Sequence, residues 1–416
     1  MHTVRLDERL YRTDAPNGVT VLSEVLPGVR SVAVGMWVRT ASAHEEAAKM
    51  GVSHLLEHMV FKGTERRSAR DIALELEARG GALDAFTSRD HTSFQARVLD
   101  EDLPRALDVL TDLVRNPTLR PSDLELERKV VLEEISTVED TPDDLVFELH
   151  TETLWPDHPY GFSILGTRET VSRLAANDLR ELHSRAYHPR HVVIAGAGNL
   201  NHDLFLKLVA KCGWFTFEPG PSPRPVEPVP DARRVIRRVE RDSAQSHIVL
   251  GTDTFPYTDR RREPLLLVNT VLGAGMSSRL FQRVREELGL AYSVYTFQSF
   301  YLGTGVTGVY VGTHPSSADE AVGVILDELR ALRRDGLGSG ALAEAKQQLK
   351  GQVTLSLESP AARMYRLATV ALHDEPYRTL DQMLADIDRI DGDRVAEVVD
   401  AFLDPDRQTI VWLGPN

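Results

Sequence analysis

A proline-rich stretch limits how this chain can fold. Residues 219–230 read Pro-Gly-Pro-Ser-Pro-Arg-Pro-Val-Glu-Pro-Val-Pro, with six prolines in twelve positions. Proline lacks a backbone N–H and disfavours the helical conformation in the residue before it, so neither a helix nor an inner strand is expected here. We therefore predict a semi-rigid linker at 218–232. It separates two halves, 1–217 and 233–416, each long enough to bury its own core.

The two halves share a weak repeat of element types. Each contains a predicted strand, Ser31–Thr40 or His247–Asp253, followed by a helix and a pair of strands. A further helix of similar phase then follows, at Leu103–Arg115 or Ser317–Arg333. This pattern predicts an α+β fold with two homologous halves, each a mainly antiparallel sheet with helices packed on one face.

Composition narrows the classes of partner and compartment. The chain has 62 acidic residues against 48 Lys and Arg, a net charge of −14, which disfavours nucleic acids and anionic membranes as partners and leaves basic peptides possible. Cys212 is the single cysteine, which excludes an intrachain disulfide and fits a reducing compartment. Met1–Asp7 has no apolar signal-peptide core and no run of 18 apolar residues occurs, so we expect a cytoplasmic protein.

The segment His54-Leu55-Leu56-Glu57-His58 carries the strongest chemical signal. On an α-helix, His54 and His58 lie four residues apart on one face, so both imidazoles can reach one ion. Glu57 projects beside them, and a carboxylate next to a metal can take a proton from a bound water. His-x-x-Glu-His is a known zinc-site signature, the inverse of His-Glu-x-x-His. A solvated helix face that carries these residues by chance is the weaker alternative.

A third zinc ligand is expected, and a long helix supplies the candidates. The pattern from Pro121 to about Val138 predicts this helix. Glu127 and Glu134 are seven residues apart on nearly the same helical face, whereas Glu133 points to a different face. The residues alone do not decide which glutamate binds the metal.

The chain as a whole resembles a known family. The motif at 54–58, the glutamate 76 residues after His58, and the segments Gly80–Thr87, Leu272–Leu280 and Arg285–Tyr292 are similar to the M16 metallopeptidases, which include pitrilysin, insulysin and the mitochondrial processing peptidase. The length is similar to that of the M16B subfamily, closest to bacterial enzymes that resemble the catalytic β subunit of the processing peptidase.

The resemblance implies a zinc metalloendopeptidase with one Zn²⁺ per chain. By this resemblance His54, His58 and Glu134 are the metal ligands and Glu57 is the general base. Glu127 matches an additional glutamate of the family that supports the site. The family also implies that the two halves form a clamshell-like chamber around the substrate.

The second half is expected to lack a metal site. Its region Val268–Leu272 corresponds to the motif but has neither His nor Glu. The resemblance implies that Arg285 and Tyr292 reach the substrate near the zinc, where Tyr292 is a candidate for stabilising the oxyanion. A surface arginine and a core tyrosine are the alternative for this pair.

Two groups of residues are expected to bind a peptide substrate. Asp84, Ala85 and Phe86 match the family's edge strand, which accepts substrate as an added strand. The family often has Asn where this chain has Asp84. Asp144 and Glu148 match acidic residues that bind an arginine just upstream of the cut in the processing peptidase, and a solvated acidic face is the alternative.

The expected substrates are short or unfolded peptides, and an acidic site at Asp144 and Glu148 would favour cleavage near basic residues. The M16B resemblance implies a homodimer, or a heterodimer with a second M16B chain. Two rival hypotheses remain: a catalytic subunit that needs a partner, and a non-catalytic peptide-binding subunit. The complete metal motif disfavours the second rival.

Overall fold

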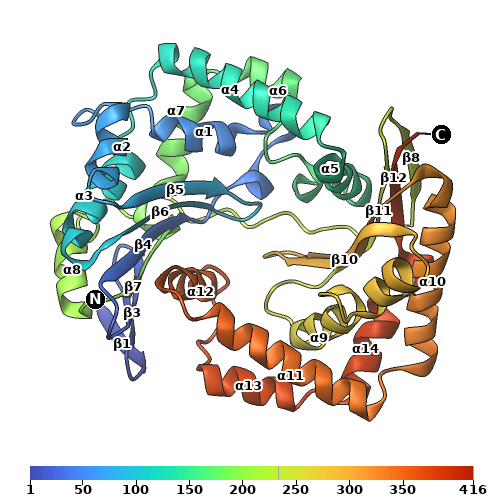
Figure 1. The fold of residues 1–416 in the computed structure, drawn as a ribbon. Helices are drawn as coiled ribbons and strands as arrows, with labels where there is room; N and C mark the ends of the chain where they lie inside the picture. The colour runs from blue at the N-terminus through green and yellow to red at the C-terminus, as the bar shows by residue number, and fades with distance from the viewer. Residues whose placement is uncertain (233, 416) are drawn as a thin grey trace. The chain divides into compact units, whose positions relative to one another are not determined.

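The computed structural model describes residues 1–232 and 234–415, which form two compact units. Each unit contains one β-sheet with several helices, which confirms the α+β class (Figure 1). The first unit comprises Met1–Ile135, Ser163–Val226 and Ser356–Tyr377, and the second comprises Ser136–Phe162, Glu227–Leu355 and Arg378–Asn416. None of the helices among these residues is long and apolar enough to cross a membrane.

The two units depart from the predicted halves 1–217 and 233–416 in two segments. Residues 136–162 belong to the second unit and residues 356–377 to the first, so each unit takes one segment from the other half of the sequence. The predicted linker at 218–232 has neither helix nor strand, and the boundary between the units falls inside it, after Val226.

A seven-stranded sheet forms the centre of the first unit. Its order is β1-β2-β3-β7-β4-β6-β5, with β3 and β7 parallel and every other neighbouring pair antiparallel. The strands are β1 (His2–Asp7), β2 (Leu10–Asp14), β3 (Thr20–Val25), β4 (Ser31–Val38), β5 (Ala82–Thr87), β6 (Thr92–Leu99) and β7 (Val192–Gly198). The helices are α1 (Val52–Val60), α2 (Ala69–Glu77), α3 (Leu103–Arg115), α4 (Pro121–Asp140, which continues into the second unit after Ile135), α6 (Arg168–Arg173), α7 (Ala176–Ala186), α8 (His202–Lys211) and α12 (Pro360–Leu372).

The second unit is built on a five-stranded sheet. Its order is β10-β11-β9-β12-β8, in which only β12 and β8 run parallel among the described residues. The strands are β8 (Ile236–Glu240), β9 (Ser246–Thr254), β10 (Ala291–Phe300), β11 (Gly305–Thr313) and β12 (Thr409–Gly414). The helices are α5 (Pro142–Leu154), α9 (Arg262–Gly273), a π-helix at Phe281–Glu287, α10 (Ala318–Asp335), α11 (Ser339–Ser356), α13 (Leu380–Asp388) and α14 (Gly392–Phe402).

Helices cover both faces of each sheet, which corrects the prediction of helices on one face. In the first unit α12 packs against the face of the sheet opposite the main core (Figure 1). Leu367 of α12 lies in one apolar cluster with Trp37 and Ala195. In the second unit α5 packs against β9 and β12 on the second face of the sheet, where Val146 and Val249 share one apolar cluster. The strands require this cover because they are apolar on both sides; β7, for example, is buried at every position.

A buried carboxylate anchors the loop that follows α1. Asp112 on α3 accepts hydrogen bonds from Thr64 Oγ1 at 2.7 Å, Arg66 Nε at 3.1 Å, Arg67 Nη1 at 2.8 Å and Asn116 Nδ2 at 3.1 Å. Burial alone would raise the pKa of Asp112, but these donors outweigh it and the pKa lies below its ordinary value. The ionised carboxylate therefore holds the loop against α3.

Replacing Asp112 by Ala should destabilise the protein by about 3–5 kcal/mol at pH 7, because it leaves buried donors without their acceptor. The pKa is lowered by folding, so this contribution is complete above the unfolded pKa of about 3.9 and is lost as the pH falls through the folded value. Urea unfolding at several pH values measures it. Asp108→Ala, at a half-exposed neighbour in the same network, should cost at most about 1 kcal/mol. Equal losses for the two variants would contradict this account.

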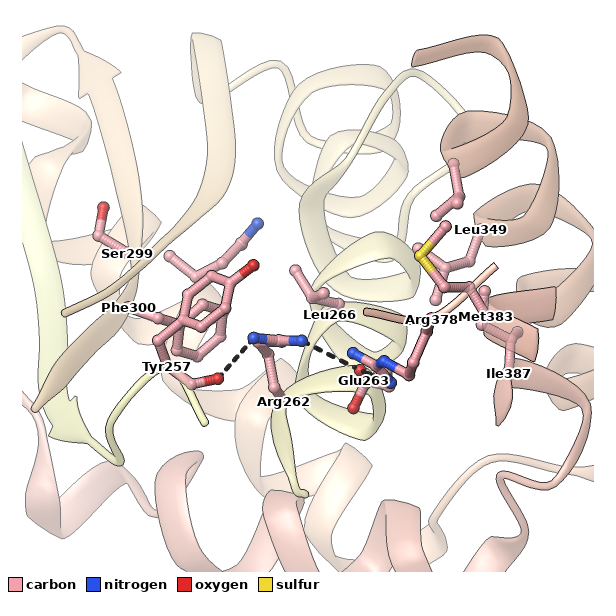
Figure 2. A pocket seen from close by; sticks show the side chains of 12 residues that line it. Tyr257, Arg262, Glu263, Leu266, Ser299, Phe300, Leu349, Arg378, Met383 and Ile387 are labelled. Atoms are coloured by element: carbon pink, nitrogen blue, oxygen red, sulfur yellow. Dashed lines mark hydrogen bonds and ion pairs between the residues drawn. The ribbon is translucent and has the colours of Figure 1, made fainter. Parts of the chain in front are cut away.

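A cavity of about 350 Å³ lies in the second unit (Figure 2). Met383 of α13 contributes to its apolar wall, while Arg262 donates a hydrogen bond to the carbonyl of Tyr257. Arg262 and Arg378 both contact the carboxylate of Glu263. The charged groups of this wall are therefore paired with one another, and the cavity belongs to a different unit from the zinc motif.

Candidate metal centre

Helix α1 places both histidines of the motif on one face. Leu55, Leu56 and Met59 are fully buried and fix the helix against the core of the first unit. The side chains of His54 and His58 lie on the remaining face, 12% and 18% exposed. The spacing of apolar residues in the sequence therefore determines where the imidazoles point.

A distant carboxylate caps the start of α1. Gly51 precedes the helix with φ of 89°, a left-handed conformation that favours glycine. Because glycine has no side chain, Gly51 cannot supply the oxygen that usually caps the first turn of a helix. Glu45 fills this role, since its carboxylate accepts the backbone N–H groups of Gly51 at 2.8 Å and Ser53 at 2.7 Å. An acceptor at this end satisfies otherwise unpaired donors and holds the helix that carries the motif.

The carboxylate of Glu134 on α4 meets both histidines. Its Oε2 lies 3.6 Å from His54 Nε2 and its Oε1 lies 3.6 Å from His58 Nε2. One ligand atom from each of the three residues lies within 4.8 Å of the others. Glu133, the neighbouring candidate, is exposed on α4.

These separations fit a metal ion better than direct hydrogen bonds. A hydrogen bond between nitrogen and oxygen is usually 2.7–3.2 Å long, shorter than the observed 3.6 Å. Ligand atoms bound at about 2.0–2.1 Å to a tetrahedral zinc ion lie about 3.4 Å from one another. Two imidazoles and a carboxylate are also a donor set that zinc prefers, so His54, His58 and Glu134 fit zinc as a group.

The two histidines differ in what holds their second nitrogen. His58 Nδ1 lies 3.2 Å from Oε2 of the buried Glu127, which fixes the proton on Nδ1 and leaves the lone pair on Nε2. His54 Nδ1 is buried and has no hydrogen-bond partner among the residues that the structure describes. Burial lowers the pKa of His54 to about 3, with a further contribution from His58, so its ring is neutral as a metal ligand must be.

Glu57 lies on α1 between the two histidines in sequence, and a residue of the sheet fixes its carboxylate by a hydrogen bond. The hydroxyl of Thr87, the last residue of β5, donates a hydrogen bond of 2.7 Å to Glu57 Oε2. Burial raises the pKa of Glu57, and the bond from Thr87 partly offsets that shift. A carboxyl group with a raised pKa beside a metal site is suited to accept and then release a proton.

Comparisons with known proteins show the family of the chain. Residues 20–168 match the model for the insulinase family, peptidase family M16, and residues 173–349 match the model for the peptidase M16 inactive domain. The chain is 39% identical to an uncharacterized zinc protease of Streptomyces coelicolor, covering 97% of this chain and 89% of that protein. It belongs to the M16 peptidase family.

Further M16 relatives and structures extend the match along the chain. An uncharacterized zinc protease of Bacillus subtilis is 40% identical over 93% of this chain and 94% of its own length. The crystal structure of a Pseudomonas fluorescens protein described as a peptidase M16 inactive domain has a TM-score of 0.92 at 21% identity and covers 98% of both chains. A Helicobacter pylori protease structure also has a TM-score of 0.92, at 20% identity over 98% of this chain and all of that one. These two structures confirm the M16 fold.

The predicted substrate strand of this M16 chain is the edge of its sheet. Among the described residues β5 pairs only with β6, which leaves its other edge open. Ala85 lies on the same face as Thr87, toward α1, because side chains alternate along a strand. Asp84 and Phe86 point to the opposite face, where Phe86 stacks on Tyr365 of α12 with ring centroids 6.0 Å apart. Their roles in binding substrate stay predictions.

The remaining predicted residues lie in the second unit. The guanidinium carbon of Arg285 lies 4.5 Å from the ring centroid of Tyr292, so the two residues form a cation–π pair. Tyr292 is 76% exposed, which excludes the core tyrosine of the alternative interpretation. Asp144 is exposed on α5 and Glu148 is half-buried there. The functions of these four residues remain predictions.

Three residues that hold the site were missed by the sequence analysis. Thr87 follows Ala85 by two positions, a spacing that places it on the same strand face. Lys62 follows His58 by four positions, about one helical turn, and its Nζ lies 2.5 Å from Glu127 Oε1. Glu45 had no such signal, because its contacts with the start of α1 depend on the loop between β4 and α1.

Replacing Thr87 by Val should raise the pKa of Glu57 further, because the hydroxyl that stabilises the charged carboxylate is removed. If Glu57 acts as a base in its ionised form, the acid limb of the pH profile of kcat/KM will move to higher pH. Peptide hydrolysis measured between pH 5 and 8 tests this shift. A profile identical to that of the wild type would exclude this role for Thr87.

Proposed function

We propose that this chain is a zinc-dependent endopeptidase that hydrolyses short or unfolded peptides bound as an added strand along β5. One zinc ion per chain is held by His54, His58 and Glu134. The main support is the position of the Glu134 carboxylate, 3.6 Å from the Nε2 atom of each histidine. Relatives named zinc proteases over nearly the whole chain provide the second support.

The proposed chemistry is metal-assisted hydrolysis. When bound, zinc supplies positive charge that polarises the scissile carbonyl and makes water more acidic. Glu57 takes the proton of the attacking water and later gives it to the leaving amine. The open edge of β5 offers backbone hydrogen bonds to the peptide, which gives affinity without demanding one sequence.

Cleavage of a mixed peptide library by the purified chain, read by mass spectrometry, tests the function. We expect cleavage when zinc is present and none after treatment with a chelator, with activity restored by added zinc. Cleavage that survives the chelator would contradict a metallopeptidase. Zinc binding without cleavage would favour a catalytic subunit that needs a partner, or a non-catalytic peptide-binding chain.

We further propose that the substrates carry a basic residue near the scissile bond, read by Asp144 and Glu148. The net charge of −14 and the exposed carboxylate of Asp144 support this preference. The same peptide library reports it directly. A double variant, Asp144→Asn with Glu148→Gln, should lose the preference while still cleaving, and a preference that persists would exclude these residues.

The assembly and compartment are part of the same proposal. We propose a homodimer, or a heterodimer with a second M16B chain, acting in the cytoplasm; the single Cys212 supports a reducing compartment. Size-exclusion chromatography with light scattering measures the mass of the purified chain. A mass of one chain that nevertheless cleaves peptides would contradict the dimer.

A further inference from the structure

A line of three charged or polar groups leads from the surface to the metal site. Lys62 Nζ lies 2.5 Å from Glu127 Oε1, and Glu127 Oε2 lies 3.2 Å from His58 Nδ1. On the other side of the ring, His58 Nε2 lies 3.6 Å from Glu134. We propose that Lys62 is a positioning residue, which holds Glu127 so that Glu127 orients His58 toward the metal. This inference rests on the zinc site of the proposed function.

The carboxylate of Glu127 depends on these two partners. Its side chain is 7% exposed, so bulk water has little access to it. Within the described part of the chain, its hydrogen bonds and ion pairs are those with Lys62 and His58. Each oxygen has one partner, and loss of the lysine frees Oε1 and lets the carboxylate rotate away from Nδ1.

The backbone of Lys62 is fixed by the structure around it. Lys62 lies just after α1 ends, and its N–H donates to the carbonyl of Met59 at 3.2 Å. Thr64, two residues later, is tied to the buried Asp112. The side chain therefore starts from a rigid position, which is what a residue needs to hold another in place.

The two histidines differ in whether a hydrogen bond orients the imidazole ring. Within residues 1–232 and 234–415, His54 Nδ1 has no hydrogen-bond partner, so packing sets the angle of its ring. His58 is the ligand whose tautomer and direction are set by hydrogen bonding, through Glu127. The geometry of the proposed metal ligands should therefore depend mainly on the orientation of His58, which Lys62 supports through Glu127.

Removing Lys62 has two opposite effects on zinc binding. Loss of a positive charge favours a cation nearby, but Lys62 is 35% exposed and solvent weakens this effect. Without Lys62, Glu127 is no longer fixed and His58 loses its orientation. Removing a residue that supports a metal ligand in this way usually weakens metal affinity about 10–100-fold. We expect the second effect to dominate.

The test compares zinc affinity in four versions of the full chain by competition with a chromophoric chelator. Lys62→Met should weaken zinc binding about 10–100-fold, and Lys62→Arg, which keeps an ion pair with Glu127, should restore most of it. Lys49→Met is the matched control, because Lys49 is 37% exposed and its ion pairs are with Asp178 and Glu181 of α7 rather than with Glu127. Its zinc affinity should equal that of the wild type.

Two further readouts separate positioning from a general loss of structure. The far-UV circular dichroism spectrum of the zinc-free Lys62→Met variant should match that of the zinc-free wild type, which shows an intact fold, although loss of the ion pair with the buried Glu127 lowers its melting temperature. With Co²⁺ in place of zinc, the visible absorption bands of Lys62→Met should change in shape, since they report ligand geometry. Unchanged or tighter zinc affinity in Lys62→Met would overturn the inference while leaving the proposed function intact. A wild-type chain that binds no zinc would overturn both.

Discussion

Glu57→Gln should lower kcat at least about 100-fold while zinc binding stays as in the wild type, since general bases contribute about 10²–10⁴-fold to rate. The amide has nearly the shape of the carboxylate and its oxygen can still accept the hydrogen bond of 2.7 Å from Thr87. It cannot take a proton from water. Glu57 is not part of the group His54, His58 and Glu134, whose ligand atoms lie within 4.8 Å of one another. The Gln substitution should therefore leave the three proposed metal ligands in place.

The measurement is kcat with a peptide substrate, together with the zinc content of the same sample. A variant that keeps its zinc and more than about a tenth of its activity would exclude Glu57 as the general base. Loss of zinc along with activity would show instead that Glu57 helps to hold the metal.

Glu134→Ala should weaken zinc binding by more than about 100-fold, beyond the range that outer-shell changes produce. This change removes one of the three proposed protein ligands, and the oxygen atoms lost are those 3.6 Å from both Nε2 atoms. Activity should fall with the bound zinc. Zinc added at high concentration should recover part of it.

Glu133→Ala is the matched control for this prediction. It removes the same side chain one position earlier on α4, where the residue is exposed and lies outside the group of metal ligands. Zinc affinity should stay within a few-fold of the wild type. If Glu133→Ala and Glu134→Ala weakened zinc equally, the assignment of the third ligand would be wrong.

The local parts of the site could be predicted because they depend on helical spacing alone. His54, Glu57 and His58 occur within a little more than one turn, so any helix over this segment brings them together, and α1 does. The choice among three glutamates on α4 could not be made from phase, because Glu127 and Glu134 share a face. Packing favours Glu134 as the proposed third ligand, because Glu127 is buried beside Lys62 and Glu134 reaches both histidines.

The exchange of helices between the units could not be predicted from the sequence. The pattern in α5 and α12 shows that each helix has an apolar face, but not which sheet that face meets. Both sheets are apolar on their second face, so each can accept a helix from either half. As a result Asp144 and Glu148, predicted in the catalytic half, belong to the second unit.

The contacts of single side chains across loops were also beyond the sequence. Glu45 reaches the start of α1 through a loop, and Thr87 reaches Glu57 from a different element. Such contacts depend on how elements pack, which spacing does not report. The contact between Arg285 and Tyr292 belongs to the same class, since the family resemblance implied only that both residues reach the substrate, whereas the structure brings their side chains into contact.

A crystal of the Glu57→Gln variant, grown with zinc and an uncleaved peptide, tests the central claim most directly. An anomalous difference map at the zinc edge should show one peak bounded by His54 Nε2, His58 Nε2 and the Glu134 carboxylate, with the peptide running along β5. A peak elsewhere, or none at this position in zinc-saturated crystals, would contradict the assignment of the metal site on which the proposed function depends.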